Sequence, residues 1–182
     1  GRSLGRVAEC EAEDIERAVI ASRRSFDSGA WSEAAPRHRK KVLMKFAELI
    51  EQHGDELALL ESLDMGKPVS DARAVDVAAT VRCMAWTGEA LDKVYGEVAP
   101  TGPGELGLVT REPLGVVFTI APWNYPYLTA VNSIIPAIMA GNTVVLKHAA
   151  NTLLVAERFQ KAFDKAKLPR GVFQHLVLNH KQ

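Results

Sequence analysis

The sequence predicts an α/β protein with a parallel sheet, preceded by a helical region. Three observations support this fold class. The last third alternates apolar runs of strand length with segments of helix length, and short connections join them. The first half instead repeats apolar residues at helical spacing. A section rich in glycine and proline separates these two parts.

The first 94 residues form the helical region. We expect helices over residues 12–28, from Pro36 onward, over 55–64 and over about 70–93. The second helix carries an apolar stripe formed by Val42, Leu43, Phe46, Leu49 and Ile50. The expected buried side of the fourth helix consists of Val77, Val81, Met84, Ala85, Gly88 and Leu91.

Residues 95–112 are rich in turn-forming residues and lead into a strand predicted over 108–111. Such a segment is either a disordered linker or a hairpin that crosses to another subunit. Composition alone favours the linker.

The final third predicts strands over residues 115–121, 143–147 and 172–178, with helices over 126–140 and 152–167 between them. Ligands of open parallel sheets bind at the carboxyl ends of the strands. The first two strands end in Pro122-Trp123-Asn124 and in Lys147, so an amide, an indole and a cation are expected close together. This combination favours a site that holds a nucleotide beside a polarised oxygen.

The composition argues against several classes of partner. Lys plus Arg and Asp plus Glu both number 22, so nothing favours nucleic acid or an anionic membrane surface. No apolar run approaches the roughly 20 residues of a bilayer span. The first residues lack the apolar stretch of a secretory signal and an initiator Met, so we expect further residues ahead of Gly1. Two cysteines, Cys10 and Cys83, are too few for a disulfide framework or a zinc site, and a cytoplasmic location is expected.

The remaining local signals leave alternatives open. We find no Gly-x-Gly-x-x-Gly fingerprint after a predicted strand, which argues against an ordinary Rossmann dehydrogenase. Asn124 is equally suited to donate hydrogen bonds to a ligand and to cap the helix that begins at Pro126. Considered alone, Trp123 is more typical of a core, and Lys147 is either a ligand contact or a surface lysine.

Several motifs together identify a family. They are Pro122-Trp123-Asn124 and Gly141-Asn142-Thr143-Val144-Val145-Leu146-Lys147, with Gly29-Ala30-Trp31, Arg37-His38-Arg39, Leu63-Asp64-Met65-Gly66-Lys67-Pro68 and Arg111-Glu112-Pro113-Leu114-Gly115-Val116 upstream. With these motifs the chain resembles the aldehyde dehydrogenase superfamily over nearly all of its length. The first two-thirds most resembles enzymes acting on amino-aldehydes such as gamma-glutamyl-aminobutyraldehyde. The run Lys147-His148-Ala149-Ala150-Asn151 is similar to one group of succinate-semialdehyde dehydrogenases.

The resemblance implies a role for each matching residue. Asn124 would stabilise the oxyanion that forms when a cysteine thiolate attacks an aldehyde. Lys147 would bind the adenosine ribose of NAD or NADP. Many relatives that prefer NAD carry a glutamate where this chain has Ala150, so NADP is expected to be accepted, with His148 as a further donor. The implied cofactor-binding residues are Ile120, Ala121, Pro122, Trp123, Asn124, Lys147, His148, Ala149 and Ala150; no metal ligand is implied.

The resemblance also implies the domain organisation. Residues 1–182 would be the N-terminal part of an NAD(P)-binding domain: a helical region (1–94), an oligomerisation arm (95–112) and the first βαβαβ units (113–182). The catalytic domain, with its nucleophilic cysteine and general-base glutamate, is expected beyond Gln182, so this chain alone is expected to be inactive. A small-molecule aldehyde and a second copy of the chain, as a dimer or tetramer, are the expected partners.

Two alternatives stay open. One is a non-catalytic relative that keeps the fold as an interaction module. The other is an oxidoreductase that forms an acyl phosphate or an acyl-CoA with the same fold. The sequence does not specify which aldehyde is the substrate.

Overall fold

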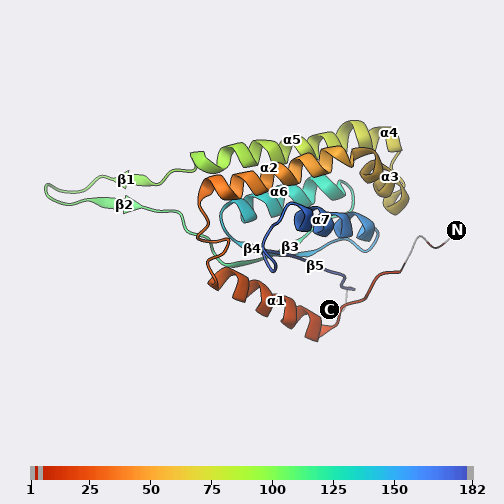
Figure 1. Ribbon diagram of the computed structural model, residues 1–182, viewed down its shortest axis with the longest axis horizontal. Helices are drawn as coiled ribbons and strands as arrows, with labels where there is room; N and C mark the ends of the chain where they lie inside the picture. Colours follow the sequence, from red (N-terminus) through yellow and green to blue (C-terminus); the bar gives the residue numbers. More distant parts are fainter. Residues whose placement is uncertain (1–2, 4–5, 180–182) are drawn as a thin grey trace.

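The computed structural model describes Ser3 and residues 6–179, so the first and last residues of the unit predicted over 1–182 lie outside the described residues. A three-stranded sheet has helices on both faces, and a long hairpin extends from the body (Figure 1). The predicted α/β class, with its helical region first, is confirmed. None of the helices among the described residues is long and apolar enough to cross a bilayer.

The sheet is parallel, with strand order β3-β4-β5. Its strands are β3 (Val116–Ile120), β4 (Thr143–Lys147) and β5 (Phe173–Leu176). β4 is central and its first four residues are buried, as expected for a strand covered on both faces. In the register Ile120 pairs with Lys147, and Lys147 pairs with Leu176, so the carboxyl ends of all three strands share one edge.

Helices α6 (Pro126–Met139) and α7 (Leu153–Lys165) make the two crossovers and cover one face of the sheet. Among the described helices, α1 (Ala12–Asp27) covers the opposite face (Figure 1). A second layer of helices packs over α6 and α7, and it includes α2 (Pro36–Gln52) and α3 (Gly54–Met65). The two layers on the α6 side meet in the main apolar core.

Aromatic side chains fill this core between the helical layers. Phe46 from α2 stacks on Phe163 from α7, with ring centroids 3.8 Å apart and 2° between the ring planes. Tyr127 meets Phe159 edge-on, with centroids 5.5 Å apart. The buried indole of Trp31 donates to the carbonyl oxygen of Ile138 at 2.8 Å. These contacts join the first helices to the βαβ units, so the two predicted regions share one core.

The helix predicted over residues 70–93 is continuous but not uniform. It consists of α4 (Val69–Asp71), a π-helical segment η1 (Ala72–Val77), α5 (Ala78–Ala90) and a 3₁₀ turn η2 (Leu91–Lys93). The expected buried residues are buried or half-buried. The π-helical segment was not predicted, and it buries Asp76.

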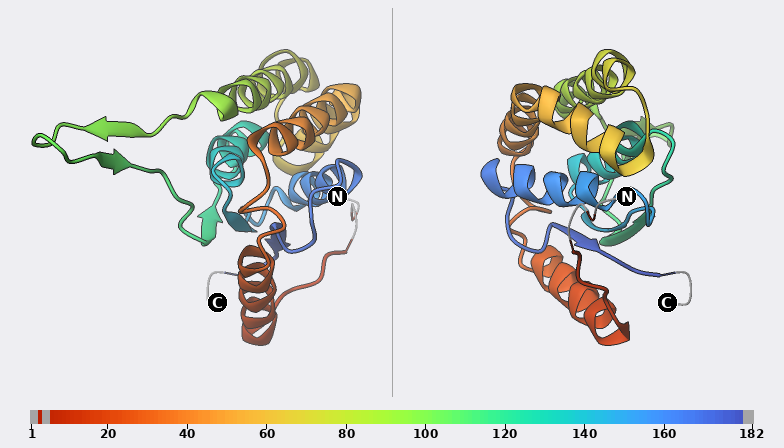
Figure 2. Two further views of the ribbon diagram at one scale, coloured as in Figure 1. Left: turned by 60° about the vertical axis from the view of Figure 1, so that its left-hand side comes forward. Right: turned by 90° about the vertical axis from the view of Figure 1, so that its right-hand side faces the viewer.

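Residues 97–109 form an antiparallel hairpin of β1 (Glu97–Ala99) and β2 (Gly107–Val109). The linker interpretation is therefore wrong, and the predicted hairpin is present; that it crosses to another subunit stays a prediction. Figure 2 shows the hairpin extending away from the helices. Gly102, Gly104 and Gly107 have the spacing of a dinucleotide fingerprint, but they connect two strands rather than a strand and a helix.

Candidate functional site

A turn formed by residues 121–126 follows the carboxyl end of β3. Both ends of this turn contact residues at the carboxyl end of β4. At its start, Ala121 N donates to the carbonyl oxygen of Lys147 at 3.0 Å. At its end, the ring of His148 lies 3.0 Å from the carbonyl oxygen of Pro126. Residues 121–126 are therefore hydrogen-bonded at both ends to residues 147–148. Sequence reasoning predicted this meeting of the two strand ends, and the structure confirms it.

Asn124 lies within this turn and is exposed. It does not cap the following helix: the N-cap position of α6 is Tyr125, and no side chain there makes a capping hydrogen bond. The carboxamide has no hydrogen-bond partner among the described residues, whereas its backbone carbonyl accepts from Lys67 at 3.1 Å. The capping alternative is therefore wrong for Asn124, and both amide hydrogens remain available to a ligand.

The residues around Asn124 are exposed to different degrees. Trp123 is 54% exposed and Ile120 is 68% exposed, so neither belongs to the core. Ala121, at the start of the turn, is buried, with only 4% of its surface exposed. Pro122 fixes φ and has no backbone donor, which stiffens the turn. An apolar surface beside an exposed amide suits the binding of a planar, polar group.

Lys147 ends the buried central strand and is itself half-buried. Its ammonium has no ion pair or hydrogen bond with any residue that the structure describes. A charge at the end of a buried strand needs a polar partner. Lys147 is therefore suited to bind a ligand hydroxyl or phosphate at this edge, and it fits the ribose contact expected from the sequence.

His148 differs from expectation. Its side chain is 1% exposed, and the ring nitrogens contact protein groups on both sides. Nε2 donates to the carbonyl of Pro126, because that oxygen only accepts, and Nδ1 accepts from Ala149 N at 3.0 Å and contacts Thr152 Oγ1 at 2.6 Å. The expectation that this ring offers a donor to the cofactor is therefore corrected: it fixes the turn from inside. Ala149 is half-buried and Ala150 is exposed.

The burial of two histidines makes stability depend on pH. Burial, with the nearby Lys147 charge, lowers the pKa of His148 to about 4. Burial, with His148 as its neighbour, lowers the pKa of His175 to about 4. The unfolded chain takes up these protons near pH 6.5, while the folded chain does not until about pH 4. Each ring therefore contributes stability above pH 6.5 that is lost as the pH falls through 4.

We expect His175→Gln to lose less stability on acidification than the parent protein. The difference between the two free energies of unfolding should change by about 1–3 kcal/mol between about pH 7 and pH 4. Denaturant unfolding at several pH values measures it. If the free energies of unfolding of the two proteins change with pH in parallel, the pKa of His175 is not lowered by folding, and the prediction is wrong.

Sequence reasoning missed a cluster of charged residues behind the turn. Lys67 follows α3, and its ammonium contacts the buried carboxylates of Glu61, at 2.9 Å, and Asp76. Lys67 Nζ also lies 4.2 Å from the centre of the Tyr125 ring. The only signal in the sequence was the motif around Gly66-Lys67-Pro68, which carried no assigned role.

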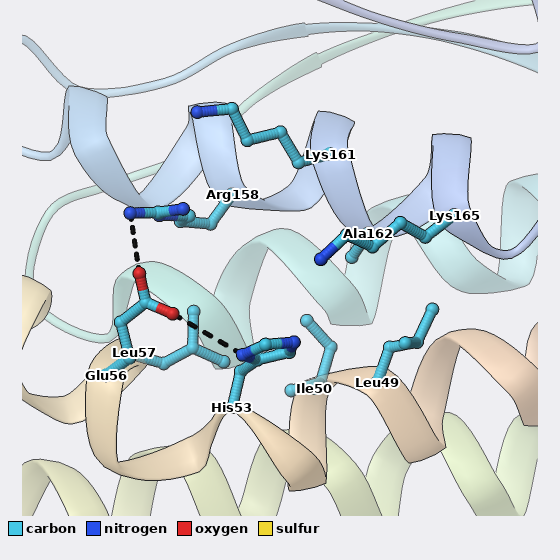
Figure 3. Close-up of a pocket in the computed structure, with 9 residues that line it drawn as sticks. All are labelled: Leu49, Ile50, His53, Glu56, Leu57, Arg158, Lys161, Ala162 and Lys165. Carbon is cyan, nitrogen blue, oxygen red and sulfur yellow. Dashed lines mark ion pairs between the residues drawn. The ribbon is translucent and has the colours of Figure 1, made fainter.

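A separate concave pocket lies between α2, α3 and α7 (Figure 3). Its lining carries three cations, Arg158, Lys161 and Lys165, and one carboxylate, Glu56, which pairs with Arg158 at 2.6 Å and lies 3.4 Å from His53. Leu49 and Ile50 contribute apolar surface. Its lining residues come from these helices and from His53 between α2 and α3, and none of them lies at the carboxyl ends of the strands. The turn that carries Asn124 is therefore the better candidate site.

Comparison with known proteins decides the family. The model of the aldehyde dehydrogenase family matches residues 1–182. The chain belongs to this family. One relative is the NADP/NAD-dependent aldehyde dehydrogenase PuuC of Escherichia coli, which is 45% identical over 169 residues, covering 93% of this chain and 34% of that protein.

Solved structures of aldehyde dehydrogenases share this fold. The indole-3-acetaldehyde dehydrogenase AldA of P. syringae, in complex with NAD+ and IAA, matches all of this chain and 37% of its own, with a TM-score of 0.97 and 49% identity. Gamma-glutamyl-gamma-aminobutyraldehyde dehydrogenase from Burkholderia cenocepacia matches 97% of this chain and 36% of its own, with a TM-score of 0.95 and 48% identity. The sequence resemblance to the family, including this amino-aldehyde enzyme, is confirmed. The chain spans about a third of the length of the curated relatives it matches.

Proposed function

We propose that this chain forms part of the cofactor site and supplies the oxyanion donor of an NAD(P)-dependent aldehyde dehydrogenase. The observation that carries the proposal is the exposed Asn124 carboxamide, which has no internal partner and lies in a turn fixed to the end of β4. A thiolate that attacks an aldehyde places negative charge on the carbonyl oxygen. An amide held in a fixed position stabilises that charge without reorganising.

We propose that the remaining chemistry belongs to other parts of the complete gene product, since this chain spans about a third of the length of its curated relatives. In the complete gene product, a cysteine forms the thiohemiacetal and then the thioester, and a glutamate activates the water that releases the carboxylic acid. Bound NAD or NADP supplies the hydride acceptor. Neither Cys10 nor Cys83 fits the nucleophile's role. Burial raises the pKa of the Cys83 thiol, which donates to Asn132 Oδ1 at 3.0 Å. We therefore expect this chain by itself to oxidise no aldehyde.

A direct assay tests the function. The complete gene product, given a short aldehyde and NAD or NADP, forms the reduced cofactor and the free carboxylic acid. Product that appears only with phosphate or coenzyme A would instead identify an acyl-phosphate or acyl-CoA enzyme. No turnover with any aldehyde would favour the non-catalytic interaction module.

The cofactor site uses the residues at the strand ends. Ile120, Ala121, Pro122, Trp123 and Asn124 form one side, and Lys147, Ala149 and Ala150 follow the next strand. The unpaired ammonium of Lys147 and the exposed side chain of Trp123 fit a ribose and a planar ring. The relatives support both cofactors, since one is named NADP/NAD-dependent and another was solved with NAD+.

Ala150 leaves room for a 2′-phosphate. A carboxylate at the ribose accepts hydrogen bonds from the diol of NAD and repels the phosphate of NADP. We therefore expect Ala150→Glu to lower kcat/KM for NADP relative to NAD by about ten- to a hundredfold. Ala150→Gln, which adds size without charge, is the control. A parent enzyme that already uses NAD at least about a hundredfold more efficiently than NADP would contradict this expectation.

The hairpin supports assembly into a homo-oligomer. Four large apolar side chains on it are between 48% and 73% exposed: Val98, Leu106, Leu108 and Val109. Exposed apolar surface of this kind marks contacts between proteins. We assign residues 95–112 to contacts between subunits of the complete gene product, which we place in the cytoplasm. Its substrate is a small aldehyde bearing an amine or a carboxylate, as the names of the relatives suggest.

A further inference from the structure

Lys67 makes four contacts, and two of them reach the turn that carries Asn124. Its ammonium contacts the carboxylates of Glu61 and Asp76 on one side. On the other side it donates to the backbone carbonyl of Asn124 at 3.1 Å and lies 4.2 Å from the centre of the Tyr125 ring. Lys67 therefore connects the helical layer to the candidate catalytic turn, 57 residues further along the chain.

The backbone around Lys67 is fixed by its neighbours. Gly66 ends α3 with φ +84°, a left-handed conformation that glycine adopts at little cost. Pro68 restricts Lys67 to extended conformations. The side chain of Lys67 is only 15% exposed, so it has little freedom to leave the cluster.

The two carboxylates come from different helical segments and are both buried. Glu61 lies in α3 and is 0% exposed, whereas Asp76 lies in the π-helical segment η1 and is 1% exposed. Buried charges require partners, and Lys67 is the partner that both share. Burial and the adjacent Asp76 carboxylate raise the pKa of Glu61 to about 8.

Lys67 makes more contacts than its pairing with the two carboxylates requires. An ammonium has three hydrogens, and the two carboxylates use only part of that capacity. The remaining hydrogen is donated to the carbonyl of Asn124, and the ammonium also lies over the face of Tyr125, a cation–π contact. Because the carbonyl and the carboxamide of Asn124 belong to one residue, a group that holds the carbonyl also limits where the carboxamide can lie.

We propose that Lys67, held by Glu61 and Asp76, is a positioning residue that fixes the Asn124 carboxamide for oxyanion stabilisation. The proposal rests on the function proposed for Asn124. Lys67 acts through Asn124 and does not touch the substrate. A displacement of about 1 Å at such a donor lowers the rate by about a hundredfold.

The experiment compares three variants of the complete gene product: Lys67→Met, Asn124→Ala and the double variant. We expect Lys67→Met to lower kcat by about ten- to a hundredfold, with a much smaller change in the KM of the aldehyde. The double variant should be no slower than Asn124→Ala, because Lys67 has no further effect once the carboxamide is absent. Lys45→Met, which removes an exposed lysine paired with Glu48, is the matched control and should keep the parent kcat.

Two results would overturn the proposal. One is a double variant whose loss equals the product of the two single losses, since Lys67 would then act independently of Asn124. The other is a Lys67→Met variant that unfolds at lower temperature while kcat is unchanged, since Lys67 would then serve only stability. If Lys67→Met does not fold, Asp76→Asn, which removes the counter-charge at constant size, is judged by the same two criteria. If Asn124→Ala keeps full activity, the proposed function fails and this proposal fails with it.

Discussion

We expect the replacement of Asn124 with alanine to lower kcat of the complete gene product by about a hundred- to thousandfold, the effect of removing one oxyanion donor. The exposed carboxamide has no other partner among the described residues, so its removal leaves no internal group unsatisfied. The fold and the melting temperature should therefore change little. Steady-state kinetics with an aldehyde substrate and thermal unfolding measure both quantities.

Two further variants sharpen this prediction. Asn124→Asp keeps the size but replaces the donor with a negative charge, so it should be at least as inactive as the alanine variant. Gln160→Ala removes another carboxamide, which lies on the exposed side of α7 and donates to Asp164 at 3.1 Å. This control should keep the parent kcat. Equal activity of Asn124→Ala and Gln160→Ala would exclude Asn124 from catalysis.

The second large effect is expected in the core. Phe46 is fully buried, stacks on Phe163 at 3.8 Å and lies 6.1 Å from the Phe159 ring. Phe46→Ala leaves a cavity between α2 and α7 and should cost about 3–5 kcal/mol. For a chain of this size the melting temperature should fall by about 6–20 °C. Thermal unfolding followed by circular dichroism measures the change.

The control for the core prediction lies on α3. Leu59 is 50% exposed, so Leu59→Ala should change the free energy of unfolding by about 0.5 kcal/mol or less. Phe46→Leu keeps much of the buried volume, so its loss of unfolding free energy should lie between those of Leu59→Ala and Phe46→Ala. If Phe46→Ala and Leu59→Ala unfold at the same temperature, the helical layer does not share a core with α7.

The strongly periodic parts of the chain were predictable. The apolar stripe beginning at Val42 and the alternation of strands and helices after Gly115 fixed element type and order, because burial of one face imposes a period. The hairpin was not predictable from composition. Its strands have only three residues each, and glycine and proline are as common in linkers as in turns. The π-helical segment was also missed, because it is set by the packing around Asp76 rather than by a pattern.

The site was predictable only where it follows from the sheet. Asn124 and Lys147 both follow strands, and parallel pairing brings such residues to one edge. His148 shows the limit of that reasoning: proximity in sequence to Lys147 suggested a ligand contact, but its ring lies in the interior. Lys67 and Asp76 are far from Asn124 in sequence, and only the packing of η1 against α3 and α6 brings them near.

The central claim is that the Asn124 carboxamide receives the negative charge of the reacting oxygen. A crystal structure of the complete gene product with its cofactor and a trapped aldehyde adduct tests this most directly. We predict that Asn124 Nδ2 lies about 2.7–3.1 Å from the aldehyde-derived oxygen. An adduct oxygen bonded to other donors, with the Asn124 side chain turned away from it, would contradict the account.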